Sequence, residues 1–525
     1  MRSDLLAQVF AACERTPRAT AIVGARGREL TFGGLRERAL RIRDRLVAEG
    51  LGRGDGVLYA VEPSPDAIAV ALGVVAAGGV LVLADPGLAP EILRARLRLA
   101  RPRWVVAGSL LYAVTSFAPL RALARRRGVL LPGLRDPLPE LELRHAYTGR
   151  WLPGVPRAAV RLRGLDGPPL HAGPGPGIDP GAGAGLGAGA VGATGAGAVG
   201  AIGASWGEVD DPAAVIFTSG TTAHPRAVVH TRASLAAGLE IFRDRFPVEP
   251  GDVVHTDGLM LGLPALIGGA TWSMPGPAKL IFERRVTHLY CVPVELAGLV
   301  ARVERLPESL RHLLLGSAPA PPAVLRKAIA AAPGAEVLSV YAMTEALPIA
   351  LASAAEKLAC AEGDLLGAPL PGVGVRFTED QELVVSGPHV ARGYLGEPPH
   401  DEVATGDLVR LDGQGRLVLL SRKKDMILRD GFNIYPSLYE PAIAALPGVA
   451  DAAIVGLADP VTGDEEVVLA LVPGDGFQEA AVRARLPALV DAGALPDRIA
   501  VLPDFPRSSR RKLDRAALRA AIGRP

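Results

Sequence analysis

The residues best suited to phosphate chemistry lie near the middle of the chain, directly after the short apolar run AAVIF at 213–217. Hydroxyl side chains surround a glycine there, in a stretch made up of Thr218, Ser219, Gly220, Thr221 and Thr222. Hydroxyl and backbone N–H groups in a compact loop can bind phosphate oxygens, and glycine lets the backbone approach them closely. Arg226 adds a positive charge four residues later. The pattern predicts a phosphate-binding loop, with an ordinary Ser/Thr turn as the alternative.

Two other motifs lie in a tract too rich in glycine and alanine to give them weight. Residues 187–192 match the dinucleotide pattern GxGxxG, and residues 203–207 match the nucleophile pattern GxSxG around Ser205. Neither follows a convincing strand, which both motifs need. A serine hydrolase using Ser205 therefore remains only an alternative from a different class. The sequence also lacks a Walker P-loop, which excludes a P-loop kinase or ATPase.

The elements that must position the loop alternate between helix and strand. Residues 35–50 and 89–100 have the spacing of amphipathic helices, and residues 56–61 that of a buried strand. The uncharged run 67–84 is long enough to span a membrane, but Gly78 and Gly79 interrupt it. It predicts a buried helix, a turn and a buried strand rather than a membrane span.

The alternation predicts an α/β fold in two domains. The first covers residues 1–420 and includes a Gly/Ala-rich low-complexity loop at about 164–207, which cannot fill a core. The second covers residues 421–525, with strands predicted at 451–458 and 466–473 and a helix at 477–493.

The overall composition excludes several partners and compartments. The chain has 57 basic and 55 acidic residues, a net charge of +2, so it offers no electrostatic footprint for nucleic acid or an anionic membrane. Three scattered cysteines favour a reducing compartment over a disulfide framework. The first residues do not have the pattern of a signal peptide. We therefore expect a cytoplasmic protein with no stable membrane insertion.

An ordered set of motifs gives the phosphate loop a family context. FTSGTTAHPRAVV at 217–229 resembles the phosphate-loop motif of the adenylate-forming (AMP-binding) superfamily, which includes acyl-CoA synthetases. YAMTEALP, ELVVSGPHVARGYL, ATGDLVR, SRKKDMILRDGFNIYPSLYE and FPRSSRRKLDR follow in the family's order. The resemblance covers nearly the whole chain outside about 130–205. It implies a large N-terminal domain of layered sheets and helices, and a small mobile C-terminal α/β domain.

The resemblance also implies roles for single residues. Thr218, Ser219, Gly220, Thr221, Thr222 and Arg226 would hold the ATP phosphates. Glu345 would ligate Mg²⁺, which prefers carboxylate oxygen, and Thr344 would contact the α-phosphate. Tyr341 would lie near the adenine, while Asp407 and Arg422 would bind the ribose. Lys424 would be the hinge of the small domain, and Gly431 would lie on the channel of an acceptor thiol.

Lys512 is the residue whose type says most. Only six of the 57 basic residues are lysine, so a lysine inside RSSRRK runs against the composition of the chain. A compact ammonium on a flexible stem can meet both a substrate carboxylate and the α-phosphate as charge builds. A solvated basic tail is the alternative.

Several positions depart from the family pattern. Ala223, Arg226 and Ala227 stand where the family usually has Gly, Lys and Gly. Ser421, Leu438 and Arg511 replace a usual Gly, Glu and Gly. These changes raise the alternative of a degenerate binding protein that lacks activity.

The acid and its acceptor are less defined. Amino-acid-activating members carry an Asp where this chain has Leu261 and Gly262, although Asp257 lies close by. The apolar surroundings suit a fatty or other aliphatic acid. GFNIYPSLYE at 431–440 favours transfer to CoA. Other segments are similar to the β-lactone synthetases of bacterial olefin biosynthesis, which use an internal hydroxyl. Loading of a carrier protein is the third alternative.

Overall fold

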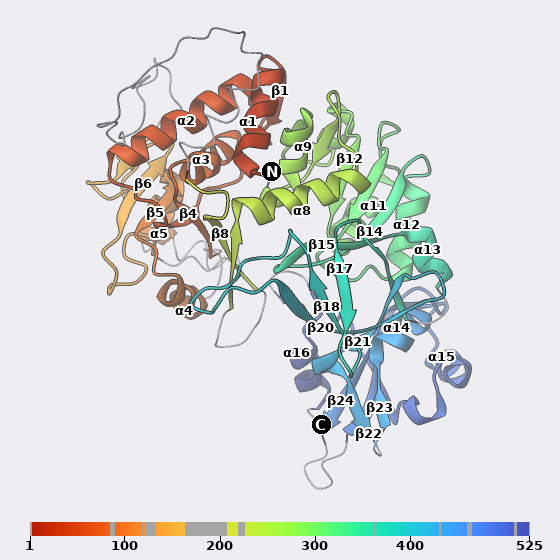
Figure 1. The fold of residues 1–525 in the computed structure, drawn as a ribbon. Coiled ribbons are helices and arrows are strands. Elements are labelled where there is room, and N and C mark those ends of the chain that lie inside the picture. Colours follow the sequence, from red (N-terminus) through yellow and green to blue (C-terminus); the bar gives the residue numbers. More distant parts are fainter. Residues whose placement is uncertain are drawn as a thin grey trace, which may run out of the picture.

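The computed structural model describes most of the chain. The described residues are 3–84, 90–117, 119–120, 133–162, 207–218, 226–360, 363–429, 432–458, 465–508 and 512–523. The Gly/Ala-rich tract, Ser205 and most of the phosphate loop (Ser219, Gly220, Thr221 and Thr222) lie outside them, as does Gly431. The two-unit α/β architecture predicted from the sequence is confirmed (Figure 1).

The first sheet carries the phosphate loop. Its described strands run in the order β19-β9-β8-β4-β3-β5-β6-β7, and β4, β3, β5, β6, β7 and β8 are parallel to their neighbours. The bounds are β3 (Gly56–Ala60), β4 (Val80–Leu83), β5 (Trp104–Gly108), β6 (Arg144–Thr148), β7 (Val160–Arg161), β8 (Pro212–Phe217), β9 (Ala227–Thr231) and β19 (Gly393–Tyr394).

The uncharged run at 67–84 folds as predicted. It forms most of α3 (Pro65–Ala76), then a turn at Gly78 with φ +81°, then β4. Gly73 lies against α2 (Phe32–Ala48) so closely that an added Cβ would be 2.7 Å from an Ile42 methyl. Within the part of the chain that the structure describes, every helix is too short or too polar to cross a bilayer.

The second sheet carries the other site residues. It runs in the order β17-β18-β20-β21-β16-β15-β14-β13-β12-β10-β11-β1-β2 among the described strands, and its middle section is parallel. The bounds are β1 (Thr20–Val23), β2 (Glu29–Thr31), β10 (Val253–His255), β11 (Thr271–Ser273), β12 (His288–Cys291), β13 (His312–Leu315), β14 (Glu336–Met343), β15 (Ala346–Ser353), β16 (Asp364–Pro369), β17 (Gly374–Phe377), β18 (Glu382–Ser386), β20 (Glu402–Leu411) and β21 (Leu417–Arg422).

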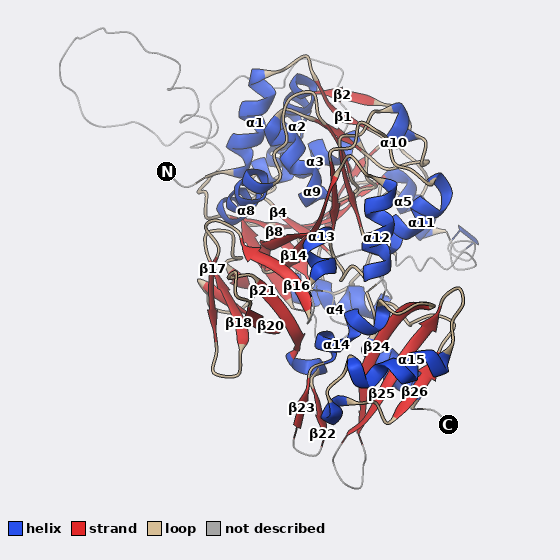
Figure 2. Cartoon of the chain, turned by 90° about the vertical axis from the view of Figure 1, so that its right-hand side faces the viewer, coloured by secondary structure: helices blue, strands red, loops and turns tan. Residues whose placement is uncertain are grey.

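Helices cover both sheets (Figure 2). Helix α8 contacts β9 of the first sheet and β15 of the second, so it lies where the two sheets meet. The remaining bounds in the large unit are α1 (Leu5–Arg15), α4 (Pro90–Ala100), α5 (Ser109–Ser116), α8 (Arg232–Arg245), α9 (Leu259–Gly268), α10 (Leu280–Glu283), α11 (Pro293–Val303), α12 (Pro322–Ala331) and α13 (Ala354–Ala359).

The C-terminal unit begins after a short linker. Strand β21 continues to Arg422, two residues beyond the predicted division at 420, and the 3-10 helix η1 (Lys423–Asp425) follows it. The bounds are β22 (Ile427–Arg429), β23 (Phe432–Ile434), α14 (Pro436–Ala444), β24 (Val449–Ala458), β25 (Glu465–Pro473), α15 (Glu479–Arg485), β26 (Arg498–Val501) and α16 (Arg515–Ile522).

The helix predicted over 477–493 is wrong in its length. Helix α15 ends at Arg485, and the chain continues as the 3-10 turn Leu486–Ala488. Pro487 explains the end, because proline has no N–H for the helix ladder and its ring collides with the carbonyl four residues earlier.

A buried ion pair ties the first helix to α8. Asp4 caps α1 by accepting from the Leu6 N–H at 2.8 Å, and its other oxygen lies 2.8 Å from the Arg232 guanidinium. The two side chains are only 8% and 2% exposed. Neither charge can return to water without moving a helix.

We expect Asp4→Ala to lower the free energy of unfolding by about 3–5 kcal/mol, because it leaves the Arg232 charge buried and unpaired. Urea unfolding of the purified protein measures this. Adding Arg232→Met should restore most of the loss, since an apolar pair avoids the charge penalty. A loss below about 1 kcal/mol in the single variant would contradict the assignment.

Candidate active site

The two ends of the phosphate loop lie opposite each other. Strands β8 and β9 are antiparallel, and the Thr218 N–H donates to the Arg226 carbonyl at 3.1 Å. The hairpin therefore places the described residues Thr218 and Arg226 at the base of the loop, as its predicted role requires.

Arg226 contacts a strand that the sequence did not single out. Its guanidinium lies 3.5 Å from the centre of the Tyr394 ring, and it forms a 3.8 Å ion pair with Glu397. Tyr394 belongs to β19, which pairs with β9 at Val228. A cation over an aromatic face is attractive, so the ring holds the end of the loop.

Glu345 and Thr344 lie at the turn between β14 and β15. The Tyr394 hydroxyl donates to Glu345 Oε1 at 2.8 Å, and Glu345 is 6% exposed. The His230 ring donates through Nε2 to the Thr344 carbonyl at 2.7 Å. Burial lowers the pKa of His230, so the neutral ring makes this contact. Tyr394 and His230 thus connect β19 and β9 of the first sheet to the turn in the second.

Tyr341, Asp407 and Arg422 form a second cluster. The Tyr341 hydroxyl donates to Asp407 Oδ2 at 2.6 Å, and Arg422 Nε lies 2.5 Å from Asp407 Oδ1. Burial raises the pKa of Asp407, and the positive Arg422 works against that rise. Burial also raises the pKa of Tyr341, so its phenol stays protonated and donates. Because Tyr341 is four residues before Glu345, the two clusters share one strand end.

The carboxyl ends of four neighbouring parallel strands meet at this same edge. Strands β10, β12, β13 and β14 run side by side, and ligands of such sheets bind at their carboxyl ends. At this edge the Tyr290 hydroxyl is hydrogen-bonded to Ser317 Oγ at 2.8 Å, and Asp257 follows β10 as an exposed carboxylate.

The position compared with the amino-acid-binding Asp is occupied by packing. Leu261 and Gly262 lie in α9, and a Cβ on Gly262 would be 2.0 Å from the Trp272 ring. No side chain fits at residue 262 without moving that indole.

Lys512 and Lys424 belong to the C-terminal unit and its linker. The Ser508 N–H donates to the Lys512 carbonyl at 2.8 Å, and α16 starts three residues later. Arg515 and Arg519 of α16 pair with Asp425 at 3.5 and 3.7 Å, next to the exposed Lys424. The Lys512 loop is therefore attached to the predicted hinge through α16.

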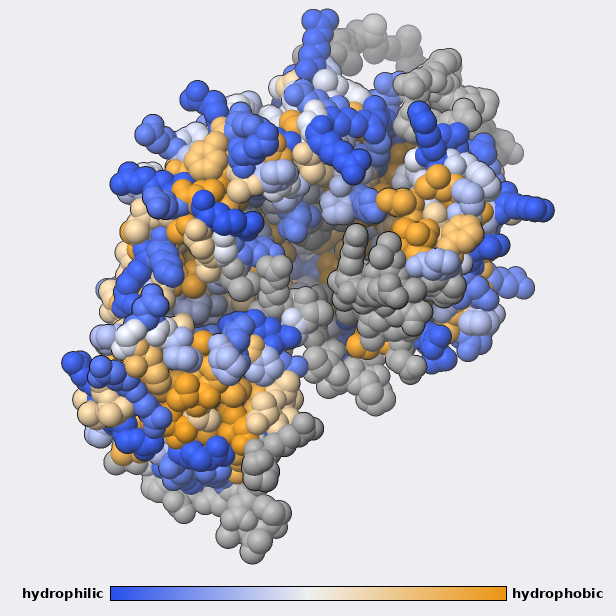
Figure 3. Space-filling model, turned by 180° about the vertical axis from the view of Figure 1, so that it is seen from behind, coloured by the Kyte–Doolittle hydropathy of each residue, from blue (hydrophilic) through white to orange (hydrophobic). Residues whose placement is uncertain are grey.

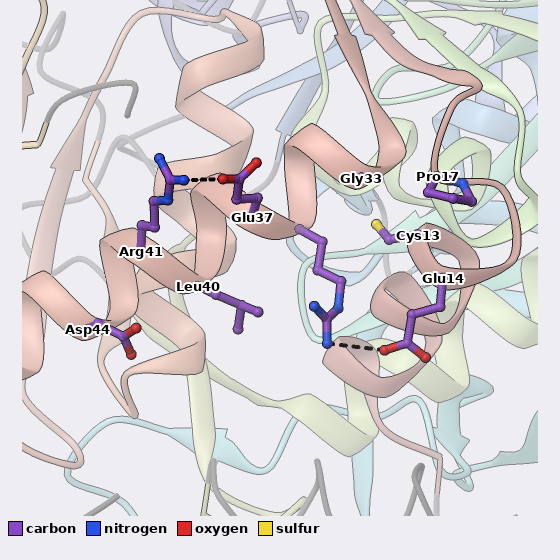
Figure 4. Close-up of a pocket in the computed structure, with 9 residues that line it drawn as sticks. Cys13, Glu14, Pro17, Gly33, Glu37, Leu40, Arg41 and Asp44 are labelled. Atoms are coloured by element: carbon purple, nitrogen blue, oxygen red, sulfur yellow. Dashed lines mark hydrogen bonds and ion pairs between the residues drawn. The ribbon is translucent and has the colours of Figure 1, made fainter. Parts of the chain in front are cut away.

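A groove of about 320 Å³ lies elsewhere, between α1 and α2 (Figure 4). Its charged groups pair with each other, Arg36 with Glu14 at 3.1 Å and Arg41 with Glu37. Burial raises the pKa of the Cys13 thiol to about 12, which makes it a poor nucleophile. The groove offers no chemistry of its own.

Sequence reasoning missed His230 and Tyr394. Both lie in or beside quoted motifs, Tyr394 within ARGYL and His230 directly after the loop motif. The RGY and VVH segments gave no sign of the contacts that β19 and β9 make with residues 344–345.

We expect Asp407→Asn to weaken AMP binding about 10- to 100-fold, because hydrogen bonds to a charged group contribute about 1.5–3 kcal/mol. Calorimetry with AMP measures this without any acid or metal. Glu402→Gln is the matched control, an exposed carboxylate on the same strand that pairs with Arg376. Equal weakening in both variants would contradict a role for Asp407 at the nucleotide.

Comparison with known proteins agrees with this arrangement. A family model described as AMP-binding enzyme matches residues 9–395, and one described as AMP-binding enzyme C-terminal domain matches residues 439–512.

Curated relatives match part of the chain. A 2-succinylbenzoate–CoA ligase of Bacillus velezensis is 31% identical over 49% of this chain and 58% of its own length. A feruloyl-CoA synthase of an Amycolatopsis species is 32% identical over 51% of this chain and 61% of its own. A probable non-canonical nonribosomal peptide synthetase of Salinispora arenicola is 30% identical, and only 4% of it is covered. The chain thus spans less than two thirds of each of these three relatives.

Solved structures share the fold over nearly the full length. The amide bond synthetase McbA from Marinactinospora thermotolerans has a TM-score of 0.76 at 22% identity, covering 99% of both chains. ATP-bound MatB from Rhodopseudomonas palustris has a TM-score of 0.74 at 24% identity, covering 100% of this chain and 99% of its own. At these identities the likeness establishes the fold alone.

Proposed function

Because its family models span residues 9–395 and 439–512, the chain belongs to the AMP-binding enzymes, and we propose that it activates a carboxylic acid with ATP. In the proposed reaction the acid carboxylate attacks the α-phosphorus of ATP. An acyl–AMP bond forms, and pyrophosphate leaves. A thiol then attacks the acyl carbon, and AMP leaves with the bridging oxygen.

One observation carries this proposal. Tyr394 joins Arg226, at the base of the phosphate loop, to Glu345, the candidate metal ligand. Side chains that would hold the β- and γ-phosphates and the cation between them are thereby neighbours. The Asp407 cluster, four residues away along β14, is suited to bind the nucleoside end of ATP.

The residues fit Mg²⁺ bound through its substrate. Among the described residues no group of three or more acidic, histidine or cysteine side chains could form a metal cage by itself. Mg²⁺ is usually held by one or two carboxylates together with substrate phosphates, and buried Glu345 supplies one carboxylate. When bound, the ion would neutralise charge on the phosphates; Glu345 would orient it.

Lys512 and the linker support a division of labour between two orientations of the small unit. We place the domain division at η1, where Lys424 is exposed. Leu513, next to Lys512, packs on an apolar cluster that includes the partly buried Leu457 and Leu502. From behind, the C-terminal unit at lower left shows a broad apolar area (Figure 3). Such a face is suited to close on the large unit during adenylation and to turn away afterwards.

We propose a fatty or other aliphatic acid as the substrate and CoA as the acceptor. The chain offers no charged side chain at 261–262 to pair with an α-ammonium. Two of the relatives named above are a CoA ligase and a CoA synthase, which favours a thiol acceptor.

A panel of acids in a pyrophosphate-release assay, with and without CoA, tests this function. We expect turnover with aliphatic acids to need CoA and to give a thioester. Thiol-independent turnover of a 3-hydroxy acid would instead support a β-lactone synthetase, whose internal hydroxyl has a high effective concentration. Pyrophosphate release that no acid stimulates would contradict the proposal.

A further inference from the structure

We propose that Tyr394 is a positioning residue that holds the Glu345 carboxylate in place for the divalent cation and couples it to Arg226 at the phosphate loop. This inference rests on the proposed function, because it assigns Glu345 to the cation. It goes further in naming a residue that binds neither nucleotide nor metal itself.

The hydroxyl of Tyr394 is built to donate to Glu345. It lies 2.8 Å from Oε1, and both residues are buried, at 8% and 6% exposed. Burial and the neighbouring carboxylate raise the pKa of Tyr394 well above its usual range, so the phenol keeps its proton. A carboxylate has two oxygens, and occupying one leaves the lone pairs of the other for a cation.

The ring of Tyr394 is fixed on three sides. Arg226 lies over it at 3.5 Å, and the His400 ring meets it edge-on with centroids 5.6 Å apart. Its backbone pairs with Val228 in β9, and the Leu395 N–H donates to the Ala227 carbonyl at 2.8 Å. A fixed ring gives the hydroxyl one direction, so the rotation of the Glu345 carboxylate is restricted.

The same contacts couple the loop to the carboxylate. Arg226 continues directly from the phosphate-loop segment, and its charge lies on the ring whose hydroxyl holds Glu345. Movement of the guanidinium toward bound phosphates changes the load on that ring. Nucleotide phosphates and cation are therefore recognised by one connected group of side chains.

Tyr394→Phe removes only the hydroxyl and tests the assignment. We expect calorimetry to show MgATP binding weakened about 10-fold, the scale of one lost hydrogen bond to a charged group, with AMP binding changed less than about 2-fold. AMP lacks the β- and γ-phosphates and needs no cation, so it reports the rest of the nucleotide site. Equal weakening for both ligands, or none for MgATP, would overturn the proposal.

Tyr59→Phe is the matched control. Its hydroxyl donates to the Ala67 carbonyl at 2.7 Å, a comparable hydrogen bond inside the first sheet's side of the fold. We expect both binding constants of this variant to stay within about 2-fold of the wild type, since no ion is involved. A preferential MgATP defect here as well would show that Tyr394 acts only through general stability.

A double-mutant cycle with Glu345→Gln isolates the pair. If Tyr394 acts through the Glu345 carboxylate, adding Tyr394→Phe to Glu345→Gln should weaken MgATP binding by less than about 2-fold further. A full further 10-fold loss would mean that Tyr394 acts elsewhere. These constants need no acid, so they judge Tyr394 even where an acid panel that shows no activity would overturn the proposed function.

Discussion

Lys512→Ala slows acyl-adenylate formation at least about 100-fold, the scale for losing a positioned charge at a reacting centre. The ammonium is the group proposed to meet both the acid carboxylate and the α-phosphate as the bond between them forms. Acid-dependent pyrophosphate release measures the effect. Lys512→Arg rescues it only in part, because a planar guanidinium cannot replace a compact ammonium in the same space.

The second half of the reaction separates this role from damage to the fold. Transfer from a presynthesised acyl-adenylate to CoA stays within a few-fold in Lys512→Ala, because the small unit has turned by then. Lys327→Ala, an exposed lysine on α12, is the control and leaves both steps unchanged. Equal damage to the two half-reactions would contradict two working orientations of the C-terminal unit.

Glu345→Gln is the second large effect. The amide keeps the size of the side chain and can still accept from Tyr394, but it loses the charge that a hard cation prefers. We expect adenylate formation to fall about 100-fold, the scale of several kcal/mol of charge stabilisation at the phosphates. Excess Mg²⁺ restores part of the rate, since weaker binding is partly overcome by concentration.

Glu336→Gln controls for the strand. Glu336 lies at the other end of β14, where it pairs with Arg245 at 2.7 Å. We expect its adenylation rate to stay within a few-fold of the wild type. Similar losses in the two variants would show that β14 tolerates no change, and would remove the evidence for a cation at Glu345.

Local sequence signals predicted the elements around the site well. The strand before the phosphate loop and the helix–turn–strand at 67–84 follow from apolar runs ended by glycine or polar residues. The helix at 477–493 was wrong because apolar periodicity outweighed Pro487, which ends α15. A local backbone constraint prevailed there over the pattern of side chains.

The contacts that assemble the site could not be predicted from spacing. Tyr341 and Asp407 are 66 residues apart, and their hydrogen bond depends on how the second sheet folds back on itself. Tyr394 reaches Glu345 only because β19 pairs with β9 of the other sheet. The resemblance suggested which residues matter, whereas the pairing of distant strands determines which of them touch.

The transfer of oxygen from the acid to AMP tests the central claim most directly. The accepted acid, labelled with ¹⁸O in its carboxylate, is incubated with ATP, Mg²⁺ and CoA, and the products are weighed by mass spectrometry. Attack of the carboxylate on the α-phosphorus predicts AMP carrying one ¹⁸O and unlabelled pyrophosphate. Unlabelled AMP, or label in inorganic phosphate beside ADP, would show that no acyl-adenylate forms.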